Sequence, residues 1–369
     1  MNRLFKRLTL ASALPLAVPG LANAQAPTPL TAQEKLAELD RQAPLMLATY
    51  DVPSVGVAYI ENGEIAFVRH YGFQSWGFPA NEETLYNVAS LTKPITAEVV
   101  MRLIEAGEVS LDTKLADYHM EEDVAGDPRT ALLTPEVVMR HRTGFLNWRY
   151  LTDGVLQFTN DPDTKTEYSG EGYEWMLQGV AAASGRDFEE AAQSLVFDPI
   201  DMPLTGYTLS GKWAGHLASP YKAGEAVYNM IHRDPVASDD LRTTAREYAR
   251  FMIDVWEGDA VSSELRCWRR TVKHYLTYKP ACKGEEKADF CPVNEGWGMG
   301  WGVHEWSDRT IVEHSGGDHG EKAFAFYDPD AKRGAVILTN GANGHEILNR
   351  LSGLLDGDPR FAEYMMSPY

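Results

Sequence analysis

Residues 87–100 read NVASLTKPITAEVV, and they place a serine and a lysine three positions apart, Ser90 and Lys93, ahead of an apolar run. Apolar residues then recur with helical spacing as far as residue 104, and Gly107 is a typical helix end. Pro94 is compatible with the first helical turn, where its missing N–H has no intrahelical role. The pattern therefore predicts a helix whose N-terminal end carries Ser90.

This spacing suits nucleophilic chemistry, because side chains three apart on a helix lie on one face, one turn apart. A serine hydroxyl attacks a substrate only when a neighbouring base removes its proton, and a lysine does so only when burial or nearby cations lower its pKa. A second match, Ser219-Pro-Tyr-Lys222, contains Pro220 and has no apolar stripe after it. We interpret that match as a loop and take Ser90 and Lys93 as the candidate pair.

Strand patterns occur at both ends of the chain, and helical patterns lie between them. Residues 54–72 contain two β-branched and aromatic runs around Glu61-Asn62-Gly63-Glu64, a hairpin signature, and strand composition returns after residue 297. We expect an α/β (α+β) fold with an antiparallel sheet built from both chain ends, flanked by helices, and a last helix near residues 345–355.

The expected sheet lobe comprises residues 25–110 and 298–369, and a mainly helical lobe comprises residues 111–297. Within it, residues 257–297 have few periodic runs and hold all three cysteines, Cys267, Cys282 and Cys291, so we interpret them as an insertion or a disulfide-tied loop. One disulfide with one thiol left over is the simplest arrangement, and the spacing does not say which two pair.

The first 24 residues have the form of a secretory signal peptide: a cationic start, an apolar stretch and a small-residue end at Ala22-Asn23-Ala24. The early prolines disfavour a membrane anchor, and no later segment is apolar enough to span a bilayer. The net charge of −19 is dispersed and disfavours nucleic acid or an anionic membrane as partner. We expect an exported, periplasmic protein.

Two later segments supply the groups that a serine and lysine pair needs. Tyr168-Ser169-Gly170 precedes a helical pattern, and His314-Ser315-Gly316-Gly317 ends a strand pattern. With Ser90-Leu91-Thr92-Lys93 they occur in the order found in a known family, and the chain resembles the serine hydrolases that group class C β-lactamases, D-alanyl-D-alanine carboxypeptidases, D-aminopeptidases and family VIII esterases. The resemblance covers nearly the whole chain after the signal peptide except about residues 257–297, and it implies a β-lactamase/transpeptidase-like fold.

The resemblance also implies roles for individual residues. Ser90 would be the acylated nucleophile, Lys93 its activating base, and Tyr168 a proton relay. The backbone N–H groups of Ser90 and Gly317 would form the oxyanion hole. The strand residues His314, Ser315 and Gly316 would bind substrate.

Two departures from the family pattern bear on the substrate. Gly170 stands where β-lactamases and carboxypeptidases usually carry an amide side chain, and His314 replaces the lysine that class C β-lactamases use near the β-lactam carboxylate. The sequence therefore favours a carboxylesterase-like enzyme acting on a small-molecule ester. The alternatives are a D-amino-acid peptidase, DD-carboxypeptidase or β-lactamase acting on cell-envelope peptide or glycan-derived substrates, and a catalytically silent envelope-binding protein.

We expect no metal and no cofactor. His314-Ser315-Gly316-Gly317-Asp318-His319 lacks the paired histidines of a zinc motif, and the three cysteines are spaced 15 and 9 apart, which matches no zinc pattern. His141 is interpreted as a structural hydrogen-bonding residue.

Overall fold

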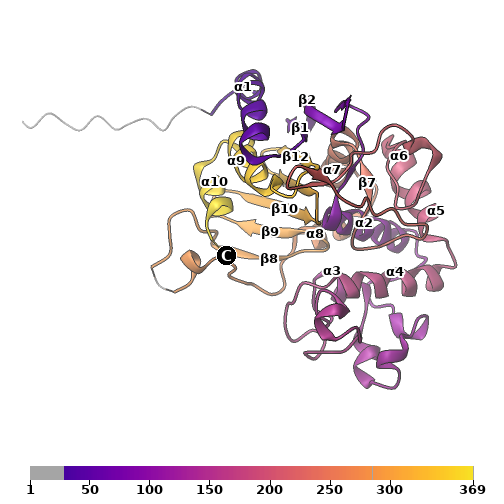
Figure 1. Cartoon of the computed structure of the whole chain (residues 1–369). Coiled ribbons are helices and arrows are strands. Elements are labelled where there is room, and N and C mark those ends of the chain that lie inside the picture. The colour runs from indigo at the N-terminus through magenta and orange to yellow at the C-terminus, as the bar shows by residue number, and fades with distance from the viewer. Residues whose placement is uncertain (1–28, 285, 369) are drawn as a thin grey trace, which may run out of the picture.

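The computed structural model describes residues 29–284 and 286–368 (Figure 1). The predicted signal peptide, residues 1–24, lies outside the described residues.

One antiparallel sheet joins the two ends of the chain. Its strand order is β3-β2-β1-β12-β11-β10-β9-β8. The two chain ends meet where β1 pairs with β12, and there Val57 lies opposite Ile337. The strands are β1 (Ser54–Glu61), β2 (Glu64–Ser75), β3 (Phe78–Pro79), β8 (Asn294–Trp297), β9 (Gly302–Glu305), β10 (Thr310–Gly317), β11 (Lys322–Asp328) and β12 (Arg333–Thr339). The predicted antiparallel sheet from both chain ends is confirmed.

The hairpin between β1 and β2 forms at the predicted turn. Asn62 and Gly63 have φ values of 55° and 76°, the left-handed conformation that a two-residue hairpin turn requires. Asparagine and glycine adopt it at least cost, which is why this dipeptide marks the turn in the sequence.

Alternation along β1 divides the core into two layers. Val57 and Tyr59 pack with helices on one face, whereas Ala58 and Ile60 belong to the core on the other face. The first face contacts α1 (Ala32–Tyr50) and α9 (Gly344–Asp356), and α7 (Ala245–Glu257) crosses the second. A further helix, α10 (Pro359–Met366), follows α9, so the expectation that the helix near residues 345–355 ends the chain is wrong.

The helical lobe lies beside the sheet, and Figure 1 shows α3 and α4 with the surrounding loops apart from the strands. The remaining helices are α2 (Thr92–Glu105), α3 (Pro135–Met139), α4 (Gly170–Ser184), α5 (Phe188–Ala192), α6 (Asp198–Ile200) and α8 (Ser263–Arg270). Single turns are η1 (Ala89–Leu91), η2 (Leu115–Asp117), η3 (Glu122–Val124), η4 (Pro128–Leu132), η5 (Arg149–Thr152), η6 (Gln193–Phe197), η7 (Gly211–Trp213) and η8 (Pro280–Cys282). Two small ladders pair β4 (Tyr86–Asn87) with β7 (Arg242–Thr243), and β5 (Tyr221–Lys222) with β6 (Glu225–Ala226).

Two elements of the expected helical lobe belong to the sheet. The sequence analysis placed residues 111–297 in that lobe, yet α7 packs on β1, β2 and β12, and β8 is the edge strand beside β9. Four residues with a glycine at their centre carry too little strand signal to reveal β8. We propose that residues 245–257 and 294–297 form part of the sheet lobe.

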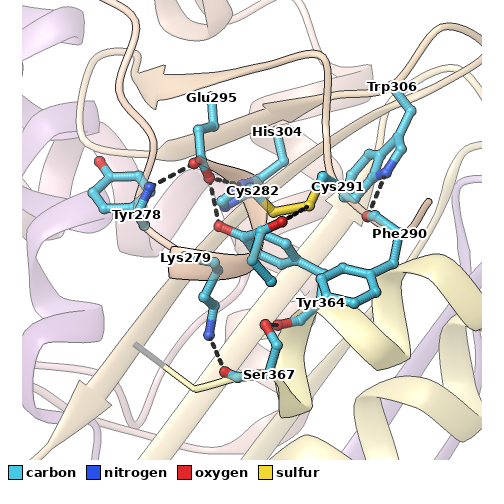
Figure 2. The surroundings of a disulfide bond; sticks show 11 residues. Tyr278, Lys279, Cys282, Phe290, Cys291, Glu295, His304, Trp306, Tyr364 and Ser367 are labelled. Carbon is cyan, nitrogen blue, oxygen red and sulfur yellow. Dashed lines mark hydrogen bonds and ion pairs between the residues drawn. A yellow bond between two sulfur atoms is a disulfide. The ribbon is translucent and has the colours of Figure 1, made fainter. Parts of the chain in front are cut away.

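The cysteine-containing segment packs against the sheet and α10. Cys282 and Cys291 form a disulfide, and Cys267 is an exposed free thiol. Figure 2 shows the surroundings of the disulfide, where Trp306 Nε1 donates to the Phe290 carbonyl over 3.0 Å. The segment also contains α8 and β8, so it is more than a disulfide-tied loop.

Buried charges hold this segment to the sheet. Glu295 of β8 accepts hydrogen bonds from the Tyr278 backbone N–H over 2.6 Å and from the Tyr364 hydroxyl (Figure 2). Its other neighbour is His304, whose second ring nitrogen lies 3.2 Å from Glu313. Burial lowers the pKa of His304, but the two carboxylates outweigh burial and raise that pKa to about 9.

Replacement of His304 is expected to lower stability in a pH-dependent way. Because the pKa is near 9 in the folded chain and about 6.5 in the unfolded chain, the stabilising contribution is complete below pH 6.5 and is lost as the pH rises through 9. The difference in Tm between wild type and His304→Asn should therefore shrink between pH 6 and pH 9.5. The exposed His345 supplies the control His345→Asn, and a His304→Asn difference independent of pH would contradict the assignment.

Candidate active site

Ser90 lies in a turn that its neighbours hold in place. The Asn87 side chain accepts from the Ala89 N–H over 2.8 Å and donates to Asp240 over 2.7 Å. Thr92 Oγ1 donates to the Ala89 carbonyl over 2.6 Å. These bonds keep Ala89 in the left-handed region, with a φ of 47°, and Ser90 at the mouth of α2.

Lys93 is completely buried, and its amine contacts the candidate nucleophile. Its Nζ lies 3.0 Å from Ser90 Oγ and donates to the Ser238 carbonyl over 2.8 Å. The other Ser-x-x-Lys match is different, because Lys222 is exposed on β5. The structure therefore brings the predicted Ser90 and Lys93 together.

The loop that carries Ser238 is fixed by a buried carboxylate. Glu174 of α4 accepts from the backbone N–H groups of Ala237 and Ser238 over 3.1 and 3.0 Å, and from the Ser238 hydroxyl. Burial raises the pKa of Glu174 above its usual value, although these hydrogen bonds oppose the shift. Sequence reasoning missed Ser238 and Glu174, since a carbonyl acceptor and an ordinary helical glutamate carry no motif.

Tyr168 lies over the buried amine. The centre of its ring is 4.7 Å from Lys93 Nζ, and it packs against His141 and Trp297 with ring centres 4.3 and 5.5 Å away. His141 Nδ1 accepts from the Ser169 N–H over 3.1 Å, the predicted structural role. Burial and then the charge of Lys93 lower the pKa of His141 well below its usual value, so the ring is a neutral support for Tyr168.

Steric crowding explains why residue 170 is a glycine. A Cβ there would approach the Trp148 ring to 3.0 Å and the Asn147 carbonyl oxygen to 3.1 Å. Both contacts are tighter than ordinary van der Waals distances, so the indole of Trp148 occupies the space that a side chain would need.

His314 lies on a strand edge that faces the site. Strand β9 pairs with β10 as far as Glu313, and within the described residues the rest of β10 pairs with β11 alone. His314 is buried, and its Nδ1 donates to the Ser315 carbonyl over 2.7 Å. Burial and then the charge of Lys93 lower its pKa to about 4, so the ring is neutral at physiological pH. Its ring centre lies 6.0 Å from that of Tyr168.

Gly316 brings β10 against the turn of Ser90. A Cβ on residue 316 would come within 2.0 Å of the Val88 carbonyl oxygen and 3.1 Å of the Leu91 nitrogen. Ser315 and Gly317, on either side of it, are exposed. Three segments distant in sequence therefore converge, and Ser315 and Gly317 lie on the strand that lines their meeting point.

A cavity of about 450 Å³ opens beside Tyr168 and His314. Its walls also include Trp297, residues 276–278 and α10. Sequence reasoning did not identify these residues, because each lies in a segment without a family motif.

Comparisons with known proteins agree with this geometry. The beta-lactamase family profile matches residues 39–351. The chain belongs to the beta-lactamase family. Members of this family are serine hydrolases, so the predicted family and enzyme class are confirmed.

Relatives within the beta-lactamase family carry several activities in their names. Penicillin-binding protein 4 of Amycolatopsis lactamdurans is 23% identical over 338 residues, covering 83% of this chain and 87% of the relative. Esterase EstB of Burkholderia gladioli is 27% identical over 193 residues, covering 44% and 49%. The D-alanine carboxypeptidase AmpC of Burkholderia cenocepacia superposes with a TM-score of 0.72 at 18% identity, covering 89% of this chain and 99% of that chain, and shows the predicted fold.

Residues 29–284 and 286–368 contain no helix long and apolar enough to cross a membrane. Over the same ranges no group of three or more His, Cys, Asp or Glu side chains is placed to hold a metal ion.

Proposed function

We propose that the protein hydrolyses an uncharged carboxylic ester through an acyl-enzyme on Ser90. The observation that carries this proposal is the 3.0 Å contact between Ser90 Oγ and the amine of the fully buried Lys93. A nucleophile within hydrogen-bond reach of its base is the arrangement that acyl transfer needs.

In the proposed reaction, Lys93 Nζ accepts the proton of Ser90 Oγ as the oxygen attacks the ester carbonyl carbon. The carbonyl oxygen becomes an oxyanion, which the backbone N–H groups of Ser90 and Gly317 stabilise. The C–O bond to the alcohol then breaks, and the alcohol oxygen receives a proton through Tyr168. In the second half-reaction a water molecule attacks the acyl carbonyl carbon and passes its proton back through Tyr168. The bond to Ser90 Oγ then breaks, Oγ recovers its proton from Lys93, and the acid is released.

The preference for an ester follows from the chemistry of two positions. Neutral His314 offers no positive charge for a substrate carboxylate, unlike a lysine at that position. Gly170 has no side chain to hold an acylamino group, and Trp148 fills the space beside it. A relative named as an esterase supports the same choice.

The second candidate is cleavage of a D-amino-acid peptide or a β-lactam from the cell envelope. It is supported by the relative named penicillin-binding protein 4 and the structural neighbour named D-alanine carboxypeptidase. In either case we propose that the protein is exported to the periplasm, on the evidence of the signal-peptide pattern in residues 1–24.

A covalent probe and a substrate panel test the proposal. A fluorophosphonate probe should label the wild type on the peptide that contains Ser90 and should not label Ser90→Ala. Short-chain p-nitrophenyl esters should be turned over faster than nitrocefin or D-Ala-D-Ala peptides. Turnover of a D-peptide with none of any ester would overturn the ester preference, and absence of labelling would indicate a catalytically silent protein of the same fold.

Tyr168→Phe is expected to slow both acylation and deacylation by about 10²-fold, because the ring packing stays and the transferable proton is lost. Rapid-mixing kinetics with a p-nitrophenyl ester separate the two half-reactions. The exposed Tyr150 gives the matched control Tyr150→Phe, which should have wild-type rates. If both half-reactions of Tyr168→Phe are as fast as in the wild type, Tyr168 is not the relay.

A further inference from the structure

The cavity beside Tyr168 extends from the candidate active site into the cysteine-containing segment. Tyr168, Trp297 and His314 line it together with Leu276, Tyr278 and Met365. Its volume of about 450 Å³ lies within the range of pockets that hold small organic ligands. Since the ring of Tyr168 also lies 4.7 Å from Lys93 Nζ, the cavity adjoins the candidate active site.

Backbone contacts fix the outer wall of this cavity. The Leu276 N–H donates to the Glu295 carbonyl over 2.7 Å, and the Tyr278 N–H donates to the Glu295 side chain over 2.6 Å. Cys282, buried at 2% exposure, anchors the end of the same segment in the core beneath α10. Hydrogen bonds and core packing therefore hold the wall in one conformation.

The charged groups around the cavity compensate one another. His304 lies between Glu295 and Glu313. Figure 2 shows Lys279, whose Nζ donates to the Ser367 carbonyl over 2.7 Å. The remaining walls are mostly aromatic or aliphatic, and His314 is neutral. An uncharged aromatic group matches such a surface, because it gains apolar contact and leaves no buried charge without a partner.

The position of Tyr168 indicates which part of an ester enters. The group that donates a proton to the leaving alcohol must lie next to the alcohol oxygen. The oxyanion position at Gly317 is three residues farther along β10 than His314, about 10 Å away for an extended strand. The cavity is lined by His314 and Ser315, so it adjoins the part of the strand that precedes the oxyanion position.

We infer that this cavity binds the alcohol part of the ester, and that the preferred alcohols carry an aromatic ring. This inference rests on the proposed function. Leu276, Tyr278, Trp297 and Met365 are the residues that set this preference.

Three esters test the inference on the intact protein: phenethyl propanoate, its isomer ethyl 3-phenylpropanoate, and ethyl propanoate. The two isomers place the same ring on opposite sides of the ester, and all three leaving alcohols are primary and similarly acidic. We expect kcat/KM for phenethyl propanoate to exceed that of each of the others by about tenfold or more. Leu276→Trp, which fills the cavity, should lower the ratio of phenethyl to ethyl propanoate turnover by about tenfold.

Tyr275→Trp is the matched control, because Tyr275 is exposed on the same loop and lies outside the cavity lining. In this variant the kcat/KM of phenethyl propanoate relative to its isomer, and relative to ethyl propanoate, should equal the wild-type values. Preference for ethyl 3-phenylpropanoate, or no preference between isomers, would overturn the inference while leaving ester hydrolysis intact.

A second measurement does not require turnover. 2-Phenylethanol should slow fluorophosphonate labelling of Ser90 in the wild type and not in Leu276→Trp. If no ester is hydrolysed, the proposed ester function fails, and the protection experiment alone supports or overturns the cavity assignment.

Discussion

Ser90→Ala and Lys93→Met are each expected to lower kcat/KM for the best ester by about 10⁴-fold or more, and the double variant should lose no more than the worse single variant. The two side chains act as one unit: Oγ needs the amine 3.0 Å away to accept its proton, and the amine has no role once the hydroxyl is absent. Methionine suits position 93, because it fills a fully buried apolar space without a charge.

The control comes from the second Ser-x-x-Lys match in the chain. Lys222 is exposed, and Lys222→Met should have wild-type kinetics. Lys93→Met leaves the Ser238 carbonyl without its buried donor, which costs roughly 1–3 kcal/mol, so thermal denaturation must show that the variant is folded. Wild-type turnover by folded Lys93→Met would mean that another group is the base.

Gly316→Ala is expected to lower kcat by about 10²- to 10³-fold, the range measured for loss of one oxyanion-hole donor. The added Cβ would lie 2.0 Å from the Val88 carbonyl oxygen, a backbone atom that cannot rotate away. Strand β10 must then separate from the turn that holds Ser90, which moves apart the two N–H groups, of Ser90 and Gly317, that we propose form the oxyanion hole.

Gly317→Ala is the comparison, since its Cβ would meet only the flexible Lys322 side chain, at 3.3 Å. This variant keeps its backbone N–H and should lose less than about tenfold, well below the loss of an oxyanion-hole donor. Steady-state kinetics and circular dichroism on both variants separate a local displacement from unfolding. Equal activity in the two variants would show that the contact between β10 and the Ser90 turn does not align the site.

Much of the site was predictable, because its main side chains lie in short motifs with local structural meaning. Ser90 and Lys93 occupy one face of a helix start, and His314 ends a run of strand residues. The hairpin turn at Asn62 and Gly63 was equally clear, since few dipeptides accept its backbone angles.

The remaining parts of the site had no such local signal. Ser238 contributes a backbone carbonyl, which any residue possesses, and Glu174 resembles any helical glutamate until the loop of Ser238 is folded against it. Trp297 acquires a role only because its ring packs against those of Tyr168 and His314, and Met365 only because α10 borders the same cavity.

Local patterns in the chain were thus sufficient for the sheet built from both ends and for the candidate pair Ser90 and Lys93, because spacing and turn chemistry act over a few residues. The family came from the resemblance of three motifs in their order along the chain. The tertiary packing alone established that the Lys93 amine is enclosed, that Gly316 presses on the turn of Ser90, and that a cavity adjoins Tyr168. These features are contacts between segments that lie far apart in the sequence, such as Val88 and Gly316. Such contacts exist only after the core has closed, so no short stretch of sequence encodes them.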